Sequence, residues 1–128
     1  MLTVTAATRI YIVAGPTDMR NSFNGLQAIV ENELRRDARK GDIFVFSNRR
    51  RDRLKLIYWE PSGFWVCSKR LEKGTFAWPA IGESHVEMTR EELALLLGGI
   101  DLLGTRRRAW YGRGIATPSR AKKVSRPS

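Results

Sequence analysis

The sequence lacks most of the residues from which catalytic and metal centres are built. It contains one histidine, His85, and one cysteine, Cys67, so neither an internal disulfide nor a metal site with several histidine or cysteine ligands can form. It also lacks the glycine-rich loops that hold phosphates or dinucleotides, and the short motifs of zinc proteases and serine hydrolases. These absences indicate that the protein is not an enzyme and needs no metal or other cofactor.

Long apolar runs are missing as well. No stretch approaches the roughly 18 apolar residues that a membrane helix needs. Residues 1–9 do not have the charged start and apolar core of a signal peptide. A single cysteine suits a reducing compartment. We therefore expect a soluble, cytoplasmic protein without a membrane partner or a small-molecule substrate.

Acidic residues are scarce relative to basic ones. The 128-residue chain has 23 Lys and Arg against 13 Asp and Glu, a net charge of +10. The excess is concentrated, because residues 105–128 carry eight basic side chains and no acidic one. Such a charge favours a polyanionic partner, which on this ground alone is DNA, RNA or an anionic membrane surface.

Several short segments have the residue pattern of β-strands. Residues 54–59 and 64–68 flank a turn that contains Pro61 and Gly63, and they predict a hairpin. Residues 43–46 are wholly apolar, which is typical of a strand buried on both faces. The remaining expected strands are residues 9–13, residues 75–78 and residues 85–88.

Two segments have helical periodicity. The first is predicted to start at an N-cap at Ser22, to run through Leu34 and to be stopped by Gly41. The second starts with a capping box of Thr89 and Glu92. Its apolar face consists of Leu93, Leu96, Leu97 and Ile100. The expected fold class is α+β, a small antiparallel sheet of about four or five strands with two main helices packed on it.

Hydrophobic residues make up 42% of the chain, which is enough for one core. We expect a single domain over residues 1–104, because the apolar patterns end there. Residues 105–128 lack hydrophobic periodicity and are expected to be a flexible basic tail. Three of the four tryptophans lie in apolar strands and are expected to pack in the core, whereas Trp110 in the tail could contact a partner.

The nucleic-acid-binding residues are expected on two basic loops. Residues 47–53 lie between apolar strands, and the arginines of this loop have phosphate as a natural counter-charge; a solvated charged loop is the alternative. Residues 69–73 form a second basic turn, which the antiparallel hairpin brings to the same end of the sheet. With the tail included, the expected phosphate contacts are Arg49, Arg50, Arg51, Arg53, Lys55, Lys69, Arg70, Lys73, Arg106, Arg107 and Arg108.

Among the carboxylates, Asp18 alone has a context that could be functional. A metal-dependent nuclease needs several carboxylates converging on Mg²⁺, and no second acidic residue has a comparable position. The simpler interpretation is that Asp18 orders its turn or pairs with Arg20. A nuclease built around Asp18 is therefore the weakest of the functional hypotheses.

Several segments together resemble a known family. They are Gly15–Arg20, Asp42–Phe46, Arg49–Asp52, Leu54–Ile57, Lys69–Gly74, Phe76–Pro79 and Leu96–Asp101. In this order they resemble TnpB, the bacterial accessory protein of the IS-sixty-six type insertion sequences, over roughly residues 5–103. The basic extension after Leu103 is less typical of that family. The resemblance implies a role in transposition beside a separate transposase and a second accessory protein.

The predicted function combines the charge with the resemblance. We expect a DNA-binding accessory protein that helps to assemble the transposase–DNA complex, with the ends of the element as the DNA partner. The alternative is a protein–protein adaptor for the transposase or the second accessory protein, with little DNA binding of its own.

Overall fold

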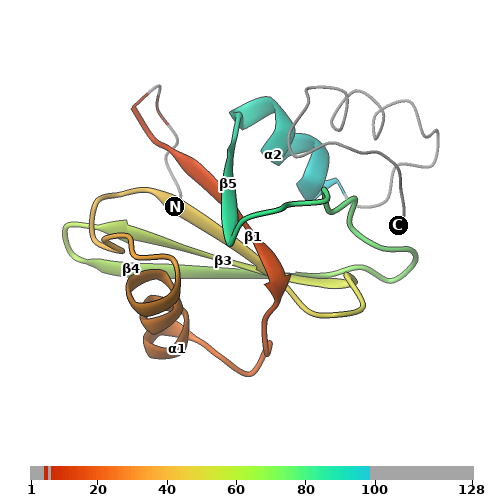
Figure 1. The fold of residues 1–128 in the computed structure, drawn as a ribbon, viewed down its shortest axis with the longest axis horizontal. Helices are drawn as coiled ribbons and strands as arrows, with labels where there is room; N and C mark the ends of the chain where they lie inside the picture. Colours follow the sequence, from red (N-terminus) through yellow and green to blue (C-terminus); the bar gives the residue numbers. More distant parts are fainter. Residues whose placement is uncertain (1–4, 6, 99–128) are drawn as a thin grey trace.

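The computed structural model describes residue 5 and residues 7–98 of the chain. A five-stranded sheet with the order β4-β3-β2-β1-β5 forms its centre (Figure 1). The strands are β1 (Ile10–Pro16), β2 (Ile43–Ser47), β3 (Arg53–Glu60), β4 (Gly63–Arg70) and β5 (His85–Met88). The helices are α1 (Phe23–Ala28), continued by a π-helical turn η1 (Ile29–Glu33), and α2 (Arg90–Leu97). The α+β class is confirmed.

The sheet is mixed, so the prediction of a purely antiparallel sheet is wrong. β1 and β2 pair in parallel, with Ile10 opposite Ile43, while the other three pairs are antiparallel. The reason is the helix between the first two strands, because it returns the chain to the end of the sheet where β1 began. The hairpin of β3 and β4 and the short strand β5 are confirmed.

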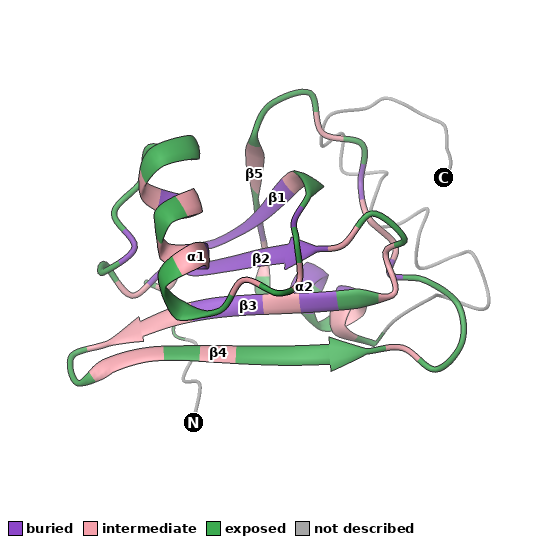
Figure 2. Cartoon of the chain, turned by 90° about the horizontal axis from the view of Figure 1, so that it is seen from below, coloured by how far each residue is buried: buried purple, intermediate pink, exposed green. Residues whose placement is uncertain are grey.

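Each face of the sheet carries its own hydrophobic core. One core joins α1 and η1 to the sheet through Leu26, Val30 and Phe44, all with side chains excluded from solvent. The other joins α2 to the opposite face through residues such as Leu96 and Val45. In Figure 1 the helices α1 and α2 accordingly lie on opposite sides of the sheet. Figure 2 shows that β1 and β2 are mostly buried, whereas β4 is largely exposed.

The first helix ends earlier than the sequence pattern predicts. The last turn is π-helical, since the N–H of Leu34 bonds to the carbonyl of Ile29 at 3.0 Å. Arg35 then adopts a left-handed conformation with a φ of 59°, which stops the helix before Gly41. Gly41, with a φ of 88°, belongs to the loop that leads into β2. The N-cap residue Ser22 makes no side-chain capping bond.

Residues 75–78 are not a strand, contrary to the prediction. Phe76 is buried in the core below α2, and its N–H bonds to the carbonyl of Arg51 at 2.6 Å. The Trp78 indole donates to the carbonyl of Val13 at 2.9 Å. This segment therefore uses its polar groups to bind two other parts of the chain instead of extending the sheet, and Pro79 limits its length.

The capping box of the second helix is confirmed. The Glu92 N–H donates to the Thr89 hydroxyl at 3.0 Å, and the Thr89 N–H donates to the Glu92 carboxylate at 2.8 Å. Leu93 and Leu96 are buried as expected, and Leu97 is partly buried, while Ile100 and the predicted tail of residues 105–128 lie outside the described residues. Neither described helix is long and apolar enough to cross a membrane.

Candidate nucleic-acid interface

Two loops meet where β1 and β2 end, because parallel strands deliver their carboxyl ends to the same edge of the sheet. The loop after β1 holds Thr17 to Asn21, and the loop after β2 holds Asn48 to Asp52. They are joined where the N–H of Thr17 donates to the carbonyl of Ser47 at 2.7 Å. The sequence therefore places its Thr17–Arg20 motif directly beside its arginine-rich loop.

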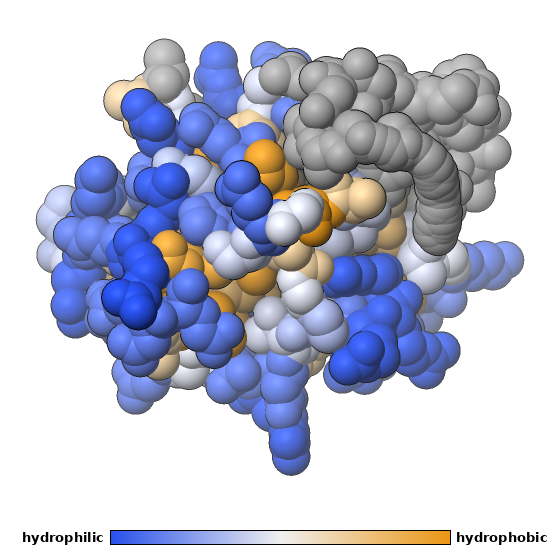
Figure 3. Space-filling model, viewed as in Figure 1, coloured by the Kyte–Doolittle hydropathy of each residue, from blue (hydrophilic) through white to orange (hydrophobic). Residues whose placement is uncertain are grey.

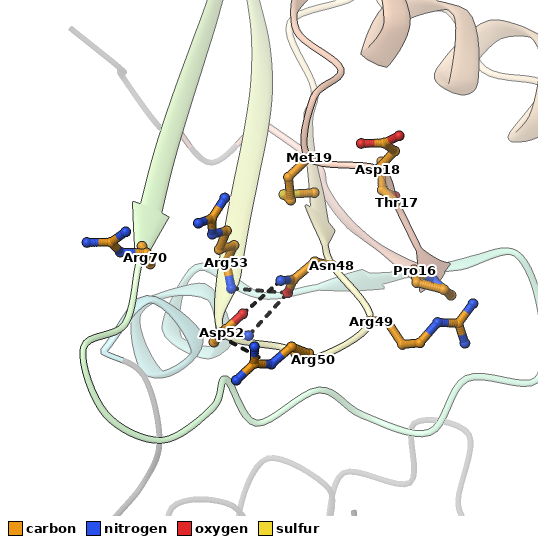
Figure 4. Close-up of a pocket in the computed structure, with 10 residues that line it drawn as sticks. All are labelled: Pro16, Thr17, Asp18, Met19, Asn48, Arg49, Arg50, Asp52, Arg53 and Arg70. Atoms are coloured by element: carbon orange, nitrogen blue, oxygen red, sulfur yellow. Dashed lines mark hydrogen bonds and ion pairs between the residues drawn. The ribbon is translucent and has the colours of Figure 1, made fainter.

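An open cleft of about 510 Å³ lies between these loops and the adjoining ends of β3 and β4. Figure 4 shows Arg53 at the start of β3 and Arg70 at the end of β4, while Arg49 and Arg50 extend from the loop. The lining residues are Pro16, Thr17, Asp18, Met19, Asn48, Arg49, Arg50, Asp52, Arg53 and Arg70. Figure 3 shows a strongly hydrophilic surface at the end of the molecule where the β2–β3 loop lies in Figure 1.

The arginine-rich loop is ordered by its own polar side chains. The Asn48 amide donates to the Asp52 carboxylate at 2.7 Å, and its oxygen accepts from the N–H groups of Asp52 and Arg53 at 3.2 and 3.1 Å. The Asn48 hydrogen bond is the main reason why the pKa of Asp52 is lowered. Asp52 thus stays ionised as a structural acceptor, and the loop presents its arginines from a defined backbone.

The loop after β1 is ordered in the same way around Asp18. The guanidinium of Arg20 contacts both carboxylate oxygens of Asp18, with the shortest N–O distance at 2.6 Å. The backbone N–H of Arg20 also donates to the Asp18 carboxylate, at 2.9 Å. The Arg20 side-chain hydrogen bond lowers the pKa of Asp18 to about 2. This geometry is the turn-ordering pair that the sequence suggested for these two residues.

Lys55 connects the sheet to that loop. Its ammonium donates to the carbonyl of Asn21 at 2.7 Å, across 34 residues of sequence. The side chain is partly buried on the α1 face of the sheet, beside Phe46 on the neighbouring strand. Lys55 braces the loop and adds positive charge beneath Asp18, whose pKa it also helps to lower.

The cleft continues into a second hollow of about 480 Å³ along β3 and β4. Both hollows are lined by Met19, Arg53 and Arg70. Arg53 and Arg70 are direct cross-strand partners, which confirms that the two basic loops share one end of the sheet. Within the described part of the chain, no carboxylate lies within 4.0 Å of the guanidinium groups of Arg49 or Arg53, while Arg50 lies 3.9 Å from Asp52 and Arg70 pairs with Glu72 at 3.4 Å.

Arg51 points away from the cleft, unlike the other arginines of its loop. Its guanidinium donates to the carbonyl of Ala14 at 2.9 Å and stacks 4.9 Å from the centre of the Trp78 ring. Its backbone is left-handed, with a φ of 61°. The residue is half-buried and holds the loop against β1 and the segment around Trp78. Arg51 therefore packs against other parts of the chain and does not line the cleft, although the sequence predicts a phosphate contact for it.

Lys69 lines the second hollow but not the cleft itself. It is paired with Leu54 and so points to the α2 face of the sheet, where its ammonium donates to the carbonyl of Leu97 at 2.6 Å. A cation at the carboxyl end of a helix satisfies the exposed carbonyl groups there. Lys73 is exposed in the turn after β4. Arg106, Arg107 and Arg108 lie outside the described residues.

The single histidine packs against neighbouring side chains, and the single cysteine lies on the surface. His85 accepts a hydrogen bond from the Arg36 guanidinium at 2.9 Å and lies against the edge of the Tyr11 ring. Burial, and then Arg36, lower the pKa of His85. Cys67 is exposed on β4. Among the described residues, no three His, Cys, Asp or Glu side chains gather as a metal ion would require.

Of the three tryptophans expected in the core, Trp59 and Trp78 are partly buried and Trp65 is exposed. Trp78 packs against the α2 core, and Trp59 contacts the edge of Phe64 with ring centres 4.8 Å apart. Trp65 is 42% exposed on β4, so it does not belong to the core. Trp110 lies outside the described residues. The alternation along β4 could have indicated this, since Trp65 shares a face with exposed Cys67 and Lys69.

Comparison with known proteins supports the family suggested by the motifs. The IS66 Orf2-like proteins match residues 8–107. The uncharacterized protein y4jC of Sinorhizobium fredii is 41% identical over 100 residues, which cover 78% of this chain and 86% of that protein. The uncharacterized protein y4hO of the same organism is 36% identical over 93 residues, covering 73% and 81%. No solved structure matches the chain significantly. The chain therefore belongs to the IS66 Orf2-like family, the TnpB accessory proteins of IS66-type insertion sequences.

Proposed function

We propose that this accessory protein binds DNA through the cleft between the β1–α1 and β2–β3 loops. The phosphate contacts come from Arg49, Arg50, Arg53 and Arg70. The ends of the insertion sequence are the DNA partner, and the bound protein helps to assemble the transposase–DNA complex. The observation that carries the proposal is the convergence of these four arginines on one open cleft.

The charge balance of the cleft supports an anionic ligand. Its two carboxylates already have partners, because Asp18 is held by Arg20 and Asp52 by Asn48. Arg50 lies 3.9 Å from Asp52 and Arg70 lies 3.4 Å from Glu72, which leaves the positive charges of Arg49 and Arg53 without a carboxylate within 4.0 Å in the described part of the chain. Arginine matches phosphate with two parallel hydrogen bonds, and several phosphate contacts together give strong binding that depends on salt.

The proposal is tested with the purified full-length chain, a duplex of an element end and an unrelated duplex of equal length. We expect binding to both, with an affinity that falls on the order of 100-fold or more between about 50 and 200 mM salt. Arg49→Ala and Arg53→Ala should each weaken binding and reduce the salt slope by about one. Arg90→Ala is the matched control, because Arg90 is an exposed arginine on α2, away from the cleft.

Three results would replace the proposal. If the chain binds DNA only when the transposase is present, it is an adaptor and the cleft is not the main DNA contact. If the Arg90 variant loses as much affinity as the Arg49 and Arg53 variants, binding depends on total charge and not on the cleft. Strand cleavage by the isolated protein with Mg²⁺ would identify it as a nuclease.

A further inference from the structure

The two edges of the sheet differ in how well they are protected against another strand. β5 is a short edge of four residues that includes the charged side chain of Glu87. β4 is an edge of eight residues, paired with β3 in an unbroken register and with no proline in it. Proteins usually protect such an edge with a bulge, a proline, a short length or a charge in its middle. In β4 the charges are confined to the last two residues, Lys69 and Arg70.

The outward backbone groups of β4 follow from the hairpin. Glu60 and Gly63 close a two-residue turn and exchange hydrogen bonds, so every second residue from Gly63 bonds inward to β3. The N–H of Leu71, which donates to the carbonyl of Asp52 at 2.9 Å, continues this alternation. The intervening residues of β4, one after each inward-bonded residue, direct their N–H and C=O groups away from β3. These outward residues are Phe64, Val66, Ser68 and Arg70.

The order of side chains along β4 is self-complementary. Aromatic residues occupy its first half, with Phe64 on one face and Trp65 on the other, and cations occupy its end. An antiparallel copy centred on Cys67 places Arg70 of the second copy opposite Phe64, and Lys69 of the second copy opposite Trp65. Because Lys69 already donates to the carbonyl of Leu97 and Arg70 lies 3.4 Å from Glu72, the main advantage of this register is that the cations of the two strands stay at opposite ends.

We propose that β4 pairs antiparallel with β4 of a second copy, centred on Cys67, to form a continuous sheet across a two-fold axis. The new ladder uses the outward groups of Phe64, Val66, Ser68 and Arg70, and it covers Trp65, which is 42% exposed. In an antiparallel ladder, opposite residues share a face, so the α1 helices of both copies lie on the same side. The two arginine clefts then also face the same side.

The test uses the full-length chain, because Cys67 is its only cysteine and reports directly on the centre of the pairing. Sedimentation equilibrium from about 1 to 200 μM, under reducing conditions and in 0.5 M salt to screen the repulsion between basic copies, should show a dimer. Mild oxidation with diamide should join the dimer covalently, since directly opposed residues at a non-hydrogen-bonded position lie within disulfide reach. Cys67→Ser should abolish the covalent link and leave the dimer intact.

Cys67→Lys is the decisive variant, because it places two like charges on the two-fold axis while the exposed position leaves the monomer fold unchanged. Ser68→Pro provides a second route, since it removes an outward N–H only. Both variants should be monomeric with a melting temperature close to that of the wild type. A wild type that is monomeric at 200 μM, or a Cys67→Lys variant that remains dimeric, would overturn the proposal. High salt should favour the dimer and weaken DNA binding. Because the dimer is measured by sedimentation without DNA, either proposal can fail while the other stands.

Discussion

Comparing variants of Arg51 and Arg49 tests which arginines of the arginine-rich loop stabilise the fold and which bind DNA. The two residues are two positions apart, yet Arg49 is exposed and Arg51 is packed against Trp78. Replacing Arg51 by Ala removes the hydrogen bond to the Ala14 carbonyl and the stacking on the Trp78 ring. Replacing Arg49 by Ala removes neither.

The expected magnitudes separate the two variants clearly. A hydrogen bond from a charged group contributes roughly 1.5–3 kcal/mol and a partly desolvated cation–aromatic contact about 0.5–2 kcal/mol. Since such terms are not additive, we expect Arg51→Ala to lower the free energy of unfolding by about 2–3 kcal/mol. A domain of this size then loses on the order of 10 °C in melting temperature. Arg49→Ala should change stability by about 0.5 kcal/mol or less.

The backbone at Arg51 supplies an internal control. Its φ of 61° is unfavourable for any residue with a Cβ atom, so Arg51→Gly should be about 1 kcal/mol more stable than Arg51→Ala although both lose the same contacts. Thermal melts and DNA titrations of the three variants complete the test. If Arg51→Ala melts with the wild type and loses DNA affinity as Arg49→Ala does, then Arg51 contacts phosphate and the reasoning is refuted.

Three further outcomes follow from charges that the fold has placed. Because the pKa of Asp18 is lowered to about 2, its contact with Arg20 stabilises the fold above about pH 4 and is lost as the pH falls towards 2. The melting temperature of Asp18→Asn should therefore fall less steeply over this pH range than that of the wild type. An unchanged pH profile would contradict this. Burial lowers the pKa of His85, so stability should fall as the pH drops below the ordinary histidine value of 6.5, and His85→Gln should remove that dependence. Arg53 lies directly opposite Arg70, and like charges in this position destabilise a sheet by up to about 1 kcal/mol. Arg53→Thr should therefore melt at or above the wild-type temperature while binding DNA less well, and a marked loss of stability would show that Arg53 is structural.

The regular elements could be predicted where local pattern decides them. The hairpin of β3 and β4 and the capping box at Thr89 depend on residues close in sequence, and both are present. The parallel pairing of β1 with β2 depends on where the intervening helix packs, which short-range periodicity does not encode. The segment around Phe76 has strand-like residues, but the N–H of Phe76 bonds to the carbonyl of Arg51 in a distant loop.

The candidate site was predictable in its composition but not in its side-chain directions. The basic loops share one end of the sheet, as the hairpin geometry predicts. Arg51 and Lys69 carry the same charges as their neighbours, and only the fold shows that they bond to the carbonyl groups of Ala14 and Leu97. The proximity of Asp18 to the arginine-rich loop follows from the parallel pairing of β1 and β2, which the local residue pattern does not predict.

The arrangement of like charges at this end of the sheet has a physical cost that the described fold offsets only in part, through the pairs Arg50–Asp52 and Arg70–Glu72. Arg53 and Arg70 are cross-strand neighbours, and Arg49 and Arg50 extend from a loop that Asn48 already holds in place. A domain selected for stability alone would have no reason to concentrate guanidinium groups around a cleft whose carboxylates are engaged. An anion in the cleft would convert that repulsion into attraction, and it would stabilise the folded state by mass action. The same reasoning connects the binding surface to the edge strand, because Arg70 belongs to both the cleft and β4, so pairing of β4 would fix one wall of the cleft.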